Sequence, residues 1–430
     1  MVNISCVASS NKGLCDDDIS GLIKKSLDQF DKPIKNVLII PPDMTRRHSG
    51  AGRITEIYYA LLSGNCKVDV LPALGTHEPM TQEECSEFFG EVPFTSILTH
   101  DWRNDVTSLG QIPAEFVQSI SEGRFSGAID VEINRRIIYG SYDLIISVGQ
   151  VVPHEVAGMA NYSKNIIVGC GGSNTINQTH FLGAVFGMER IMGHQDNPVR
   201  SVFDYAEENF LKGIPLMYVL TVATEQNGKA IIHGVFIGRG RTLFDQAAIL
   251  SRQMNFTYVD RPLNKVVVYL NEMEFKSTWL GNKAIYRTRM AIADGGELVI
   301  LAPGLKKFGE DDINDQLIRK YGYVGTEKVL ALCEQNDDLY ENLSVAAHLI
   351  HGSTEGRFSV TYAPGKLTKK EIESVSFGYM PYHQALNKYN PTTICDGFNI
   401  IGGEQIYFIS NPALGLWTTK DRFETQTNQL

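Results

Sequence analysis

The sequence lacks the features of membrane-spanning and nucleic-acid-binding proteins. No stretch approaches the roughly 18 apolar residues of a membrane span, and the first 20 residues contain no basic segment followed by an apolar run. We therefore expect a soluble, cytoplasmic protein. The 39 Lys and Arg are outnumbered by 49 Asp and Glu, so the net charge of −10 gives no overall attraction for nucleic acid.

Cysteine motifs and nucleotide-binding fingerprints are missing as well. The seven cysteines are odd in number, widely scattered and never in C-x-x-C spacing, which argues against a disulfide framework and a structural zinc site. Neither the P-loop pattern G-x-x-x-x-G-K-[ST] nor a complete G-x-G-x-x-G occurs. No internal repeat or low-complexity tract is present, so we expect ordinary folded domains with reduced thiols.

Short runs rich in Val and Ile, which end at or near Gly, Pro or Asp, alternate with helical patterns. The runs predict buried strands at Asn36–Ile40, Lys67–Leu71, Leu144–Val148, Asn165–Val168, Lys265–Leu270, Glu297–Leu301 and Phe358–Tyr362. The helical patterns lie at Asp17–Phe30, Thr55–Ser63, Arg200–Leu211 and Asp312–Tyr321. Strand–helix alternation predicts an α/β fold with largely parallel sheets.

The length of 430 residues exceeds what one hydrophobic core usually organises. A break at Val259–Asn264, before a fresh strand, predicts an N-terminal domain at 1–262 and a C-terminal α/β domain at 263–430. We expect the C-terminal tail to pack back on the N-terminal domain or to fray.

Reactive side chains gather in three loops that follow predicted strands, where open α/β sheets bind their ligands. The first loop, PPDMTRRHSGAG, carries Asp43 and Arg46, and the second, PALGTHEPMT, carries His77 before a helix expected near Thr81. The third contains His154, Lys164 and His180, separated by several glycines.

Each of these groups has a plain structural explanation as well as a functional one. Gly169–Thr175 is either a tight turn or an anion cradle at a helix start. Lys164 is either a surface lysine or, if buried, a nucleophile or attachment point. His77, His154 and His180 have no i, i+4 spacing, so a metal would need ligands from separate loops or from a cofactor.

Order and spacing together resemble the lactate racemase family. The matching motifs are Asp43-Met44-Thr45-Arg46, Gly75-Thr76-His77 and His154-Glu155-Val156-Ala157-Gly158, followed by Lys164 and His180. The resemblance covers about residues 30–305. It implies an isomerase with two α/β domains and an active site in the cleft between them.

The resemblance also implies a cofactor, the nickel pincer nucleotide (nickel pyridinium-3,5-bisthiocarboxylic acid mononucleotide). Lys164 would be its covalent attachment residue and His180 the nickel ligand. His77 and His154 would act as alternating bases beside the substrate, while Asp43, Arg46, Gly75 and Thr76 would contact the cofactor, and Arg46 the substrate carboxylate too. The implied partners are a small 2-hydroxy acid and the cofactor-building enzymes, with no nucleic acid or membrane.

The C-terminal half departs from the family pattern on the substrate side. Lys283 aligns with a substrate-binding lysine, but Leu280 replaces a glutamine and Tyr340 a substrate-facing tryptophan. The Gly-Gly before the cofactor lysine is replaced by Asn161-Tyr162-Ser163.

These departures predict a substrate other than lactate, either a sugar acid such as gluconate or, as the next candidate, malate. Its tail would be bound by polar groups drawn from Tyr340, His348, His351, Ser353 and Arg357. The alternative is that these residues cap helices or lie at the surface in contact with water.

Two other functions remain open from the sequence. One is a nickel-independent lyase or hydrolase that uses the three histidines around zinc or another divalent ion. The other is a carrier of the cofactor or of a sugar acid, although a carrier has no use for two bases.

Overall fold

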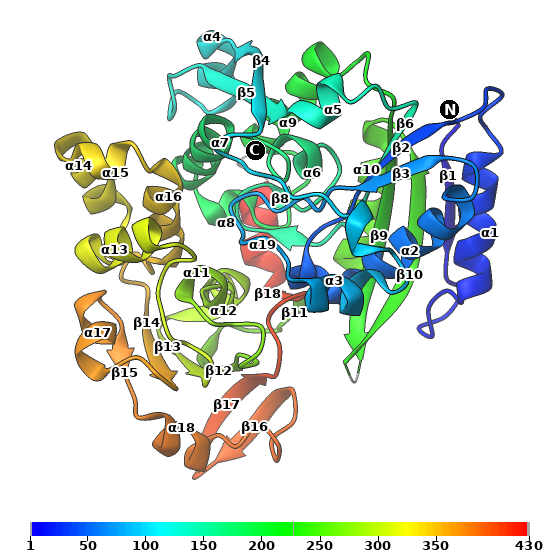
Figure 1. Ribbon diagram of the computed structural model, residues 1–430. Coiled ribbons are helices and arrows are strands. Elements are labelled where there is room, and N and C mark those ends of the chain that lie inside the picture. Colours follow the sequence, from blue (N-terminus) through cyan, green and yellow to red (C-terminus); the bar gives the residue numbers. More distant parts are fainter. Residues whose placement is uncertain (1, 227, 428–430) are drawn as a thin grey trace. The chain divides into compact units, whose positions relative to one another are not determined.

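The computed structural model describes residues 2–226 and 228–427, and the fold is mixed α/β with mainly parallel sheets. Backbone contacts divide the chain into two compact units (Figure 1). Unit 1 comprises Met1–Leu182 and Ile191–Asn255, and unit 2 comprises Gly183–Arg190 and Phe256–Leu430. The division into an N-terminal domain at 1–262 and a C-terminal domain at 263–430 stays a prediction.

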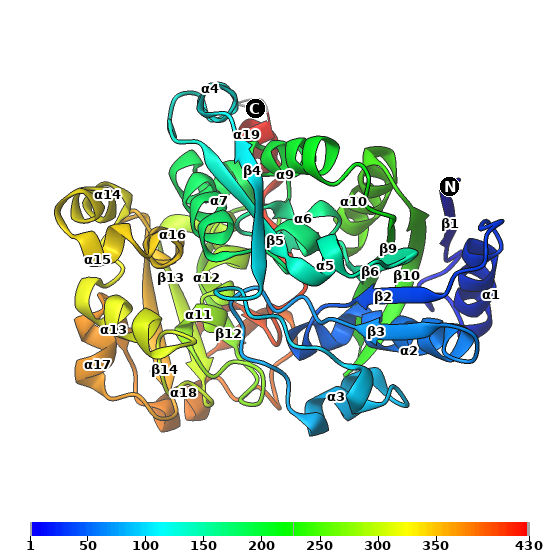
Figure 2. The same cartoon turned by 45° about the horizontal axis from the view of Figure 1, so that its top comes forward.

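Unit 1 is built on a six-stranded sheet with two small accessory sheets. The strand order is β1-β10-β9-β6-β2-β3, and β3, β2, β6 and β9 are mutually parallel. Its strands are β1 (Ile4–Val7), β2 (Asn36–Ile40), β3 (Lys67–Val70), β4 (Val106–Ile112), β5 (Ile129–Asn134), β6 (Leu144–Gln150), β7 (Pro153–His154), β8 (Gly158–Met159), β9 (Leu216–Gln226) and β10 (Lys229–Gly238). Figure 2 shows β4 and β5 as a separate hairpin with α4 at its tip.

Helices cover both faces of this sheet because the side chains of a strand alternate between faces. Val37 and Ile39 pack with residues of α1 and α2, while Leu38 and Ile40 are equally buried on the other face. The helices are α1 (Asp16–Leu27), η1 (Met44–Ser49), α2 (Ala51–Leu62), α3 (Gln82–Phe89), η2 (Phe94–Ser96), α4 (Ala114–Ile120), α5 (Arg135–Tyr139), α6 (Ser163–Ile167), α7 (Ser173–Phe186), α9 (Pro198–Phe210) and α10 (Arg241–Asn255). The last residues of α7 belong to unit 2.

Unit 2 has a six-stranded sheet of its own, in the order β15-β14-β13-β12-β17-β16, and its strands are parallel except β16. The strands are β11 (Phe256–Tyr258), β12 (Leu263–Tyr269), β13 (Ile292–Ala302), β14 (Phe358–Pro364), β15 (Gly378–Tyr379), β16 (Gly397–Ile401), β17 (Glu404–Ile409) and β18 (Leu416–Thr418). The helices are α8 (Met188–Ile191), α11 (Thr278–Gly281), α12 (Lys283–Thr288), α13 (Asp312–Tyr321), α14 (Thr326–Gln335), α15 (Asp337–Tyr340), α16 (Leu343–Gly352), α17 (Lys369–Ser374), α18 (Tyr382–Lys388) and α19 (Lys420–Thr427).

The C-terminal tail is ordered through its strand and its helix. β18 pairs in parallel with β11, and Phe423 of α19 meets Phe256 edge-on, with 5.2 Å between ring centroids. β11 lies inside the predicted N-terminal range but belongs to unit 2.

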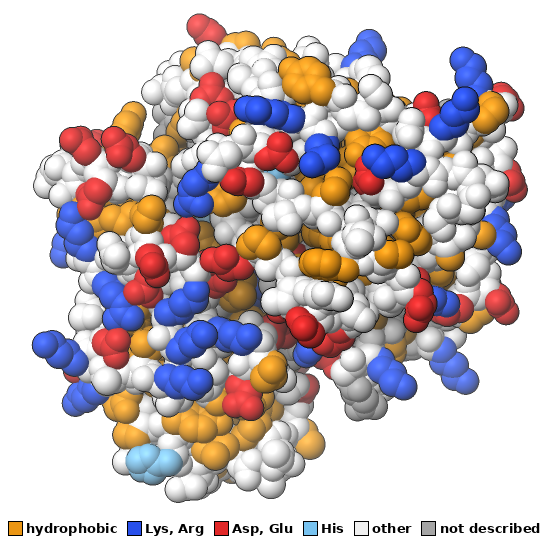
Figure 3. Space-filling view, viewed as in Figure 1, with side chains coloured by type: hydrophobic (Ala, Val, Ile, Leu, Met, Phe, Trp, Pro, Cys, Tyr) orange, Lys and Arg blue, Asp and Glu red, His pale blue; other side chains and the backbone are white. Residues whose placement is uncertain are grey.

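The surface carries charges of both signs. On the face drawn in Figure 3, Lys and Arg side chains are interspersed with Asp and Glu. Within the described part of the chain, no helix is both long and apolar enough to cross a membrane.

Six of the seven predicted strands and all four predicted helices are confirmed. The strand predicted at Asn165–Val168 is wrong, because these residues lie in and directly after α6. A short apolar run fits a buried helical turn as well as a strand. Here Asn165 is buried, and its side-chain amide donates to the Ile40 carbonyl at 3.1 Å and to Ser147 Oγ at 3.0 Å. These bonds dock α6 against the end of β2 and the middle of β6.

Candidate functional site

The three predicted loops meet at one edge of the unit 1 sheet. β2 is flanked by β3 and β6, and all three run in the same direction, so their carboxyl ends lie together. The second and third loops are joined by a hydrogen bond from the Gly75 N–H to the Gly169 carbonyl at 2.9 Å. Gly75 has φ +56°, a left-handed conformation that glycine adopts without steric cost. Thr76 beside it is half-buried.

Asp43 at the end of β2 orients His77 at the end of β3. The Asp43 carboxylate caps η1 by accepting the Thr45 N–H at 2.9 Å, and its other oxygen lies 2.5 Å from His77 Nδ1. Burial alone would raise the pKa of Asp43, but the charge of His77 and the hydrogen bonds from His77 and Thr45 outweigh burial and lower that pKa to about 2. An ionised carboxylate at Nδ1 holds the proton there and leaves Nε2 as the basic nitrogen of His77.

His154 is held in the opposite way. It lies in β7, is 6% exposed, and its Nδ1 accepts the N–H groups of Val156 at 3.1 Å and Ala157 at 3.4 Å. A neutral imidazole whose Nδ1 accepts must carry its hydrogen on Nε2. The site therefore contains two imidazoles with different tautomers. The Nε2 of His77 is a proton acceptor, and the Nε2 of His154 is a hydrogen-bond donor.

Lys164 follows a strained turn. Asn161 and Tyr162 both have positive φ, 63° and 58°, although neither is glycine. Conformations of this kind cost on the order of 1–3 kcal/mol each and persist only where the surroundings enforce them. Burial and the charge of Arg46, opposed by Glu155, lower the pKa of Lys164 to about 8. About a tenth of the amine is therefore unprotonated at pH 7.

His180 presents a single ring nitrogen. From the middle of α7 its Nδ1 donates to the Ile176 carbonyl at 2.7 Å. Burial and the charge of Lys164 lower the pKa of His180 to about 4, so the ring is neutral at pH 7. A neutral imidazole with Nδ1–H fixed on a carbonyl and a lone pair at Nε2 is the usual form of a metal-ligating histidine.

The segment Gly169–Thr175 does not form an open anion cradle. The Glu132 carboxylate accepts the Asn174 N–H at 2.9 Å, and the Glu132 carbonyl accepts the Gly172 N–H at 3.1 Å. The start of α7 is therefore satisfied by a carboxylate of the chain itself.

Glu155 is a member of the site that the sequence analysis did not single out. Its side chain is 18% exposed, and its negative charge raises the pKa of both Lys164 and His180 against the opposing effect of burial. Its position next to His154, within the matched motif, was the available signal.

The predicted substrate residues lie in unit 2. Lys283 is buried at the start of α12, with its amine 5.7 Å from the centre of the Phe275 ring. Tyr340 at the end of α15 is 65% exposed. His348 of α16 is buried, and both of its ring nitrogens meet tyrosine hydroxyls, those of Tyr286 at 2.9 Å and Tyr323 at 2.8 Å. The substrate-binding roles of Lys283, Tyr340 and His348, and a site in a cleft between domains, stay predictions.

Two further polar groups of the predicted substrate set are engaged within unit 2. Arg357 forms ion pairs with Glu189 at 2.7 Å and Asp294 at 3.0 Å. Ser353 Oγ donates to the Leu349 carbonyl at 2.8 Å. These contacts fit the structural explanation of both residues.

Across the residues that the structure describes, no three His, Cys, Asp or Glu side chains gather closely enough to hold a metal ion by themselves. His77, His154 and His180 thus do not form a three-histidine metal site. A metal at His180 would need most of its ligands from another bound group.

Comparisons with known proteins point to one family. Residues 19–191 match the family model described as the lactate racemase N-terminal domain. The curated lactate racemase of Thermoanaerobacterium thermosaccharolyticum is 27% identical over 220 residues, which cover 48% of this chain and 46% of that protein. The match therefore spans about half the length of the curated relative.

Solved structures extend the likeness over nearly the whole chain. A crystal structure of a protein from Thermotoga maritima aligns with a TM-score of 0.81 and 25% identity, covering 96% of this chain and 100% of that one. The lactate racemase apoprotein of Thermoanaerobacterium thermosaccharolyticum aligns with a TM-score of 0.65 and 16% identity, over 93% of this chain and 92% of that one. At that identity the second match shows the shared fold.

Proposed function

Because the chain belongs to the lactate racemase family, we propose that it is a racemase or epimerase that inverts C2 of a 2-hydroxy acid. The observation that carries the proposal is the grouping of two oppositely oriented imidazoles, His77 and His154, with Lys164 and His180 at one sheet edge. Two groups able to move a proton suit a reaction that must act on both hands of one substrate.

The residues present fit a nickel pincer nucleotide. Lys164 offers a partly unprotonated amine for covalent attachment, and His180 offers one neutral nitrogen to a metal whose other ligands the cofactor would provide. When bound, this cofactor supplies an acceptor and donor of hydride. That chemistry avoids removing a proton from carbon beside an ionised carboxylate, which would create a costly dianion.

The two imidazoles would bind the substrate hydroxyl group and transfer its proton. The His77 Nε2 accepts that proton from one enantiomer, while Asp43 stabilises the imidazolium that results. His154, with its hydrogen on Nε2, would donate a hydrogen bond to the oxygen of the planar 2-keto acid, and the His77 imidazolium would return the proton to that oxygen as the product forms. To act as the base for the other enantiomer, His154 would carry its hydrogen on Nδ1 instead. Arg46, whose charge acts on the Lys164 amine, would pair with the substrate carboxylate.

We propose a substrate other than lactate. The first candidate is a sugar acid such as gluconate, and the second is malate. Support comes from the departures at Leu280 and Tyr340, which exchange a glutamine and a tryptophan of the family pattern. Lys283 would contribute the second cation for the substrate. A panel of single-enantiomer 2-hydroxy acids, each followed by chiral chromatography, would identify the compound.

The test is intact mass spectrometry with nickel analysis on protein co-expressed with cofactor-building enzymes. We expect one covalent adduct with about one nickel per chain, lost in Lys164→Ala and kept in Lys67→Ala, since Lys67 is a 71% exposed surface residue. Unmodified protein holding stoichiometric zinc or another ion would favour the lyase or hydrolase alternative. An adduct without turnover of any 2-hydroxy acid would favour a carrier.

A further inference from the structure

The side chain of Arg200 forms hydrogen bonds to the turn that precedes Lys164. Its acceptors lie on either side of Tyr162 in the sequence. Arg200 lies in the first turn of α9 and is fully buried. Its guanidinium donates to the Met159 carbonyl at 2.6 Å, to Ser163 Oγ at 3.0 Å and to the Asn161 carbonyl at 3.4 Å. These acceptors bracket Tyr162, the non-glycine residue with φ 58° and ψ −136°.

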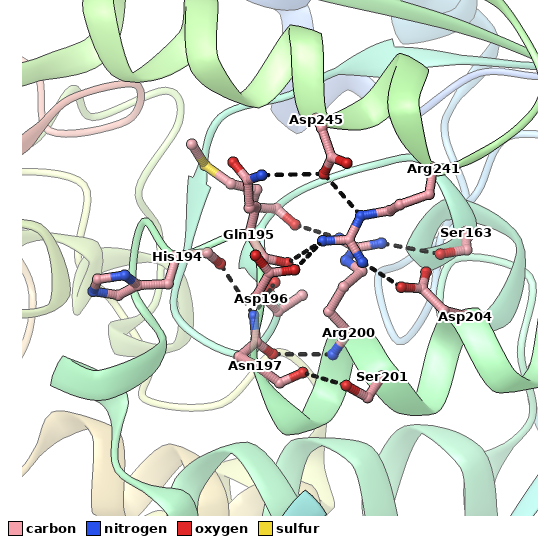
Figure 4. A network of polar contacts seen from close by, with 12 residues as sticks. Ser163, His194, Gln195, Asp196, Asn197, Arg200, Ser201, Asp204, Arg241 and Asp245 are labelled. Carbon is pink, nitrogen blue, oxygen red and sulfur yellow. Dashed lines mark hydrogen bonds and ion pairs between the residues drawn. The ribbon is translucent and has the colours of Figure 1, made fainter. Parts of the chain in front are cut away.

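The carboxylates near Arg200 form ion pairs with a neighbouring arginine, Arg241. Figure 4 shows Asp196, Asp204 and Asp245 around Arg241, which forms ion pairs with all three. Among the described residues, no carboxylate forms an ion pair with Arg200. Both terminal nitrogens of the guanidinium donate to the turn, and a buried guanidinium left without those acceptors would be strongly disfavoured.

The same helix start also holds the loop of His154. Asn197, the N-cap of α9, accepts the Arg200 N–H at 3.0 Å and donates from its side-chain amide to the Ala157 carbonyl at 3.2 Å. Ala157 is one of the two residues whose N–H groups fix His154. Aromatic packing completes the support, since Tyr162 stacks on Phe244 and the Arg200 guanidinium lies 4.3 Å from the centre of that ring.

We propose that Arg200 is a positioning residue that holds Asn161 and Tyr162 in their positive-φ conformations and thereby presents the Lys164 amine for covalent loading. Glycine would adopt positive φ at no steric cost, whereas Asn161 and Tyr162 do so only under external constraint. The inference rests on the proposed function in one respect, namely that Lys164 is the attachment residue.

The first experiment uses cofactor-free protein and hydrogen exchange of backbone amides. In Arg200→Met, amides of residues 161–169 should exchange at least about tenfold faster, because hydrogen bonds from a charged group are lost there. Arg200→Lys should give an intermediate rate, since one ammonium can satisfy only part of the acceptor set. The control is Arg239→Met, because Arg239 also donates to two carbonyls, those of Leu211 and Ile214, and forms no hydrogen bond to residues 159–163.

The second experiment measures occupancy of the Lys164 adduct in the same variants after co-expression. We expect Arg200→Met to load less than about one fifth as much as wild type, Arg200→Lys to recover part of the loading, and Arg239→Met to load normally. Unchanged local exchange, or equal loss of loading in Arg200→Met and Arg239→Met, would overturn the proposal.

The two proposals fail in different ways. A wild-type chain that carries no adduct contradicts the attachment role of Lys164, and with it the delivery role of Arg200. The exchange rates then still decide whether Arg200 holds the turn. If Arg200→Met does not fold, Arg200→Lys against Arg239→Lys provides the same comparison.

Discussion

Lys164 in unit 1 and Lys265 in unit 2 are both half-buried lysines in the interior of an α/β unit, yet their surroundings are opposite. Lys265 lies between two carboxylates, with its amine 2.8 Å from Glu297 and 2.9 Å from Glu404, and these hydrogen bonds raise the pKa of Lys265 against the effect of burial. Across the described residues no carboxylate forms an ion pair with Lys164, so burial dominates and lowers its pKa.

The histidines repeat this contrast. In unit 2, both nitrogens of His348 meet tyrosine hydroxyls and the ring stacks on Trp279, with 4.5 Å between centroids. In unit 1, the described residues give His180 a single hydrogen bond, at Nδ1. Lys265 and His348 of unit 2 are thus paired with other polar side chains, whereas Lys164 and His180 of unit 1 form no such side-chain pair among the described residues. Titratable side chains without such pairs are typical of functional sites, so this difference supports the proposal that the cofactor and substrate bind at the unit 1 site.

The largest expected effect concerns the two lysines. With a pKa of about 8, roughly half of Lys164 is unprotonated at pH 8, whereas Lys265 has a raised pKa and less than about one part in 300 is unprotonated. Brief treatment of cofactor-free protein with a small acylating reagent should therefore modify Lys164 at least about 100-fold faster. Peptide mass spectrometry measures both rates.

The double variant Glu297→Gln with Glu404→Gln sharpens this test. Loss of both carboxylates should lower the pKa of Lys265 and increase its acylation, while Lys164 remains unchanged because it lies in the other unit. Equal rates for Lys164 and Lys265 in wild type would contradict the contrast.

The next effect concerns the stability of the two histidine sites. His348→Ala removes two buried hydrogen bonds and a stacked ring, so it should lower the free energy of unfolding by about 3 kcal/mol. His180→Ala removes one hydrogen bond at a helical position that alanine favours, and should cost less than about 1 kcal/mol. Urea unfolding measures both values, and a larger cost at His180 would reverse the interpretation.

Much of the fold and several residues of the candidate site could be predicted from local sequence. Val- and Ile-rich runs located the central strands, and the polar residues just after them located Asp43, His77 and His154. Thr81 was the expected helix start, and it caps α3 by accepting the Glu84 N–H at 3.2 Å. Such signals are local because strand burial, loop position and capping depend on neighbouring residues.

The remainder depends on contacts between distant residues. The identity of Tyr162 does not indicate positive φ, and the guanidinium that donates to the residues on either side of it belongs to Arg200, 38 positions later. The Asp43–His77 pair joins two loops 34 residues apart, and the strand wrongly predicted at Asn165–Val168 is a helical turn docked on two other strands. Short apolar runs and single polar residues take their conformations from such tertiary contacts.

The Asp43 carboxylate accepts a hydrogen bond from His77 Nδ1 inside the unit 1 site, and the pH dependence of this contact gives the smallest expected effect. The pKa of Asp43 is about 2 in the folded protein and near 3.8 in the unfolded chain. A lowered folded-state pKa contributes stability above pH ~4, and that stability is lost as the pH falls to about 2. Over this window, wild type should lose about 2 kcal/mol more than Asp43→Asn, which has no carboxylate to protonate.

Urea unfolding at several pH values measures the difference between the two proteins, in which the titration of all other carboxylates cancels. Parallel curves for wild type and Asp43→Asn would show that the Asp43 carboxylate is not held by His77 in solution, and His77 would then lose the constraint that makes Nε2 its basic nitrogen.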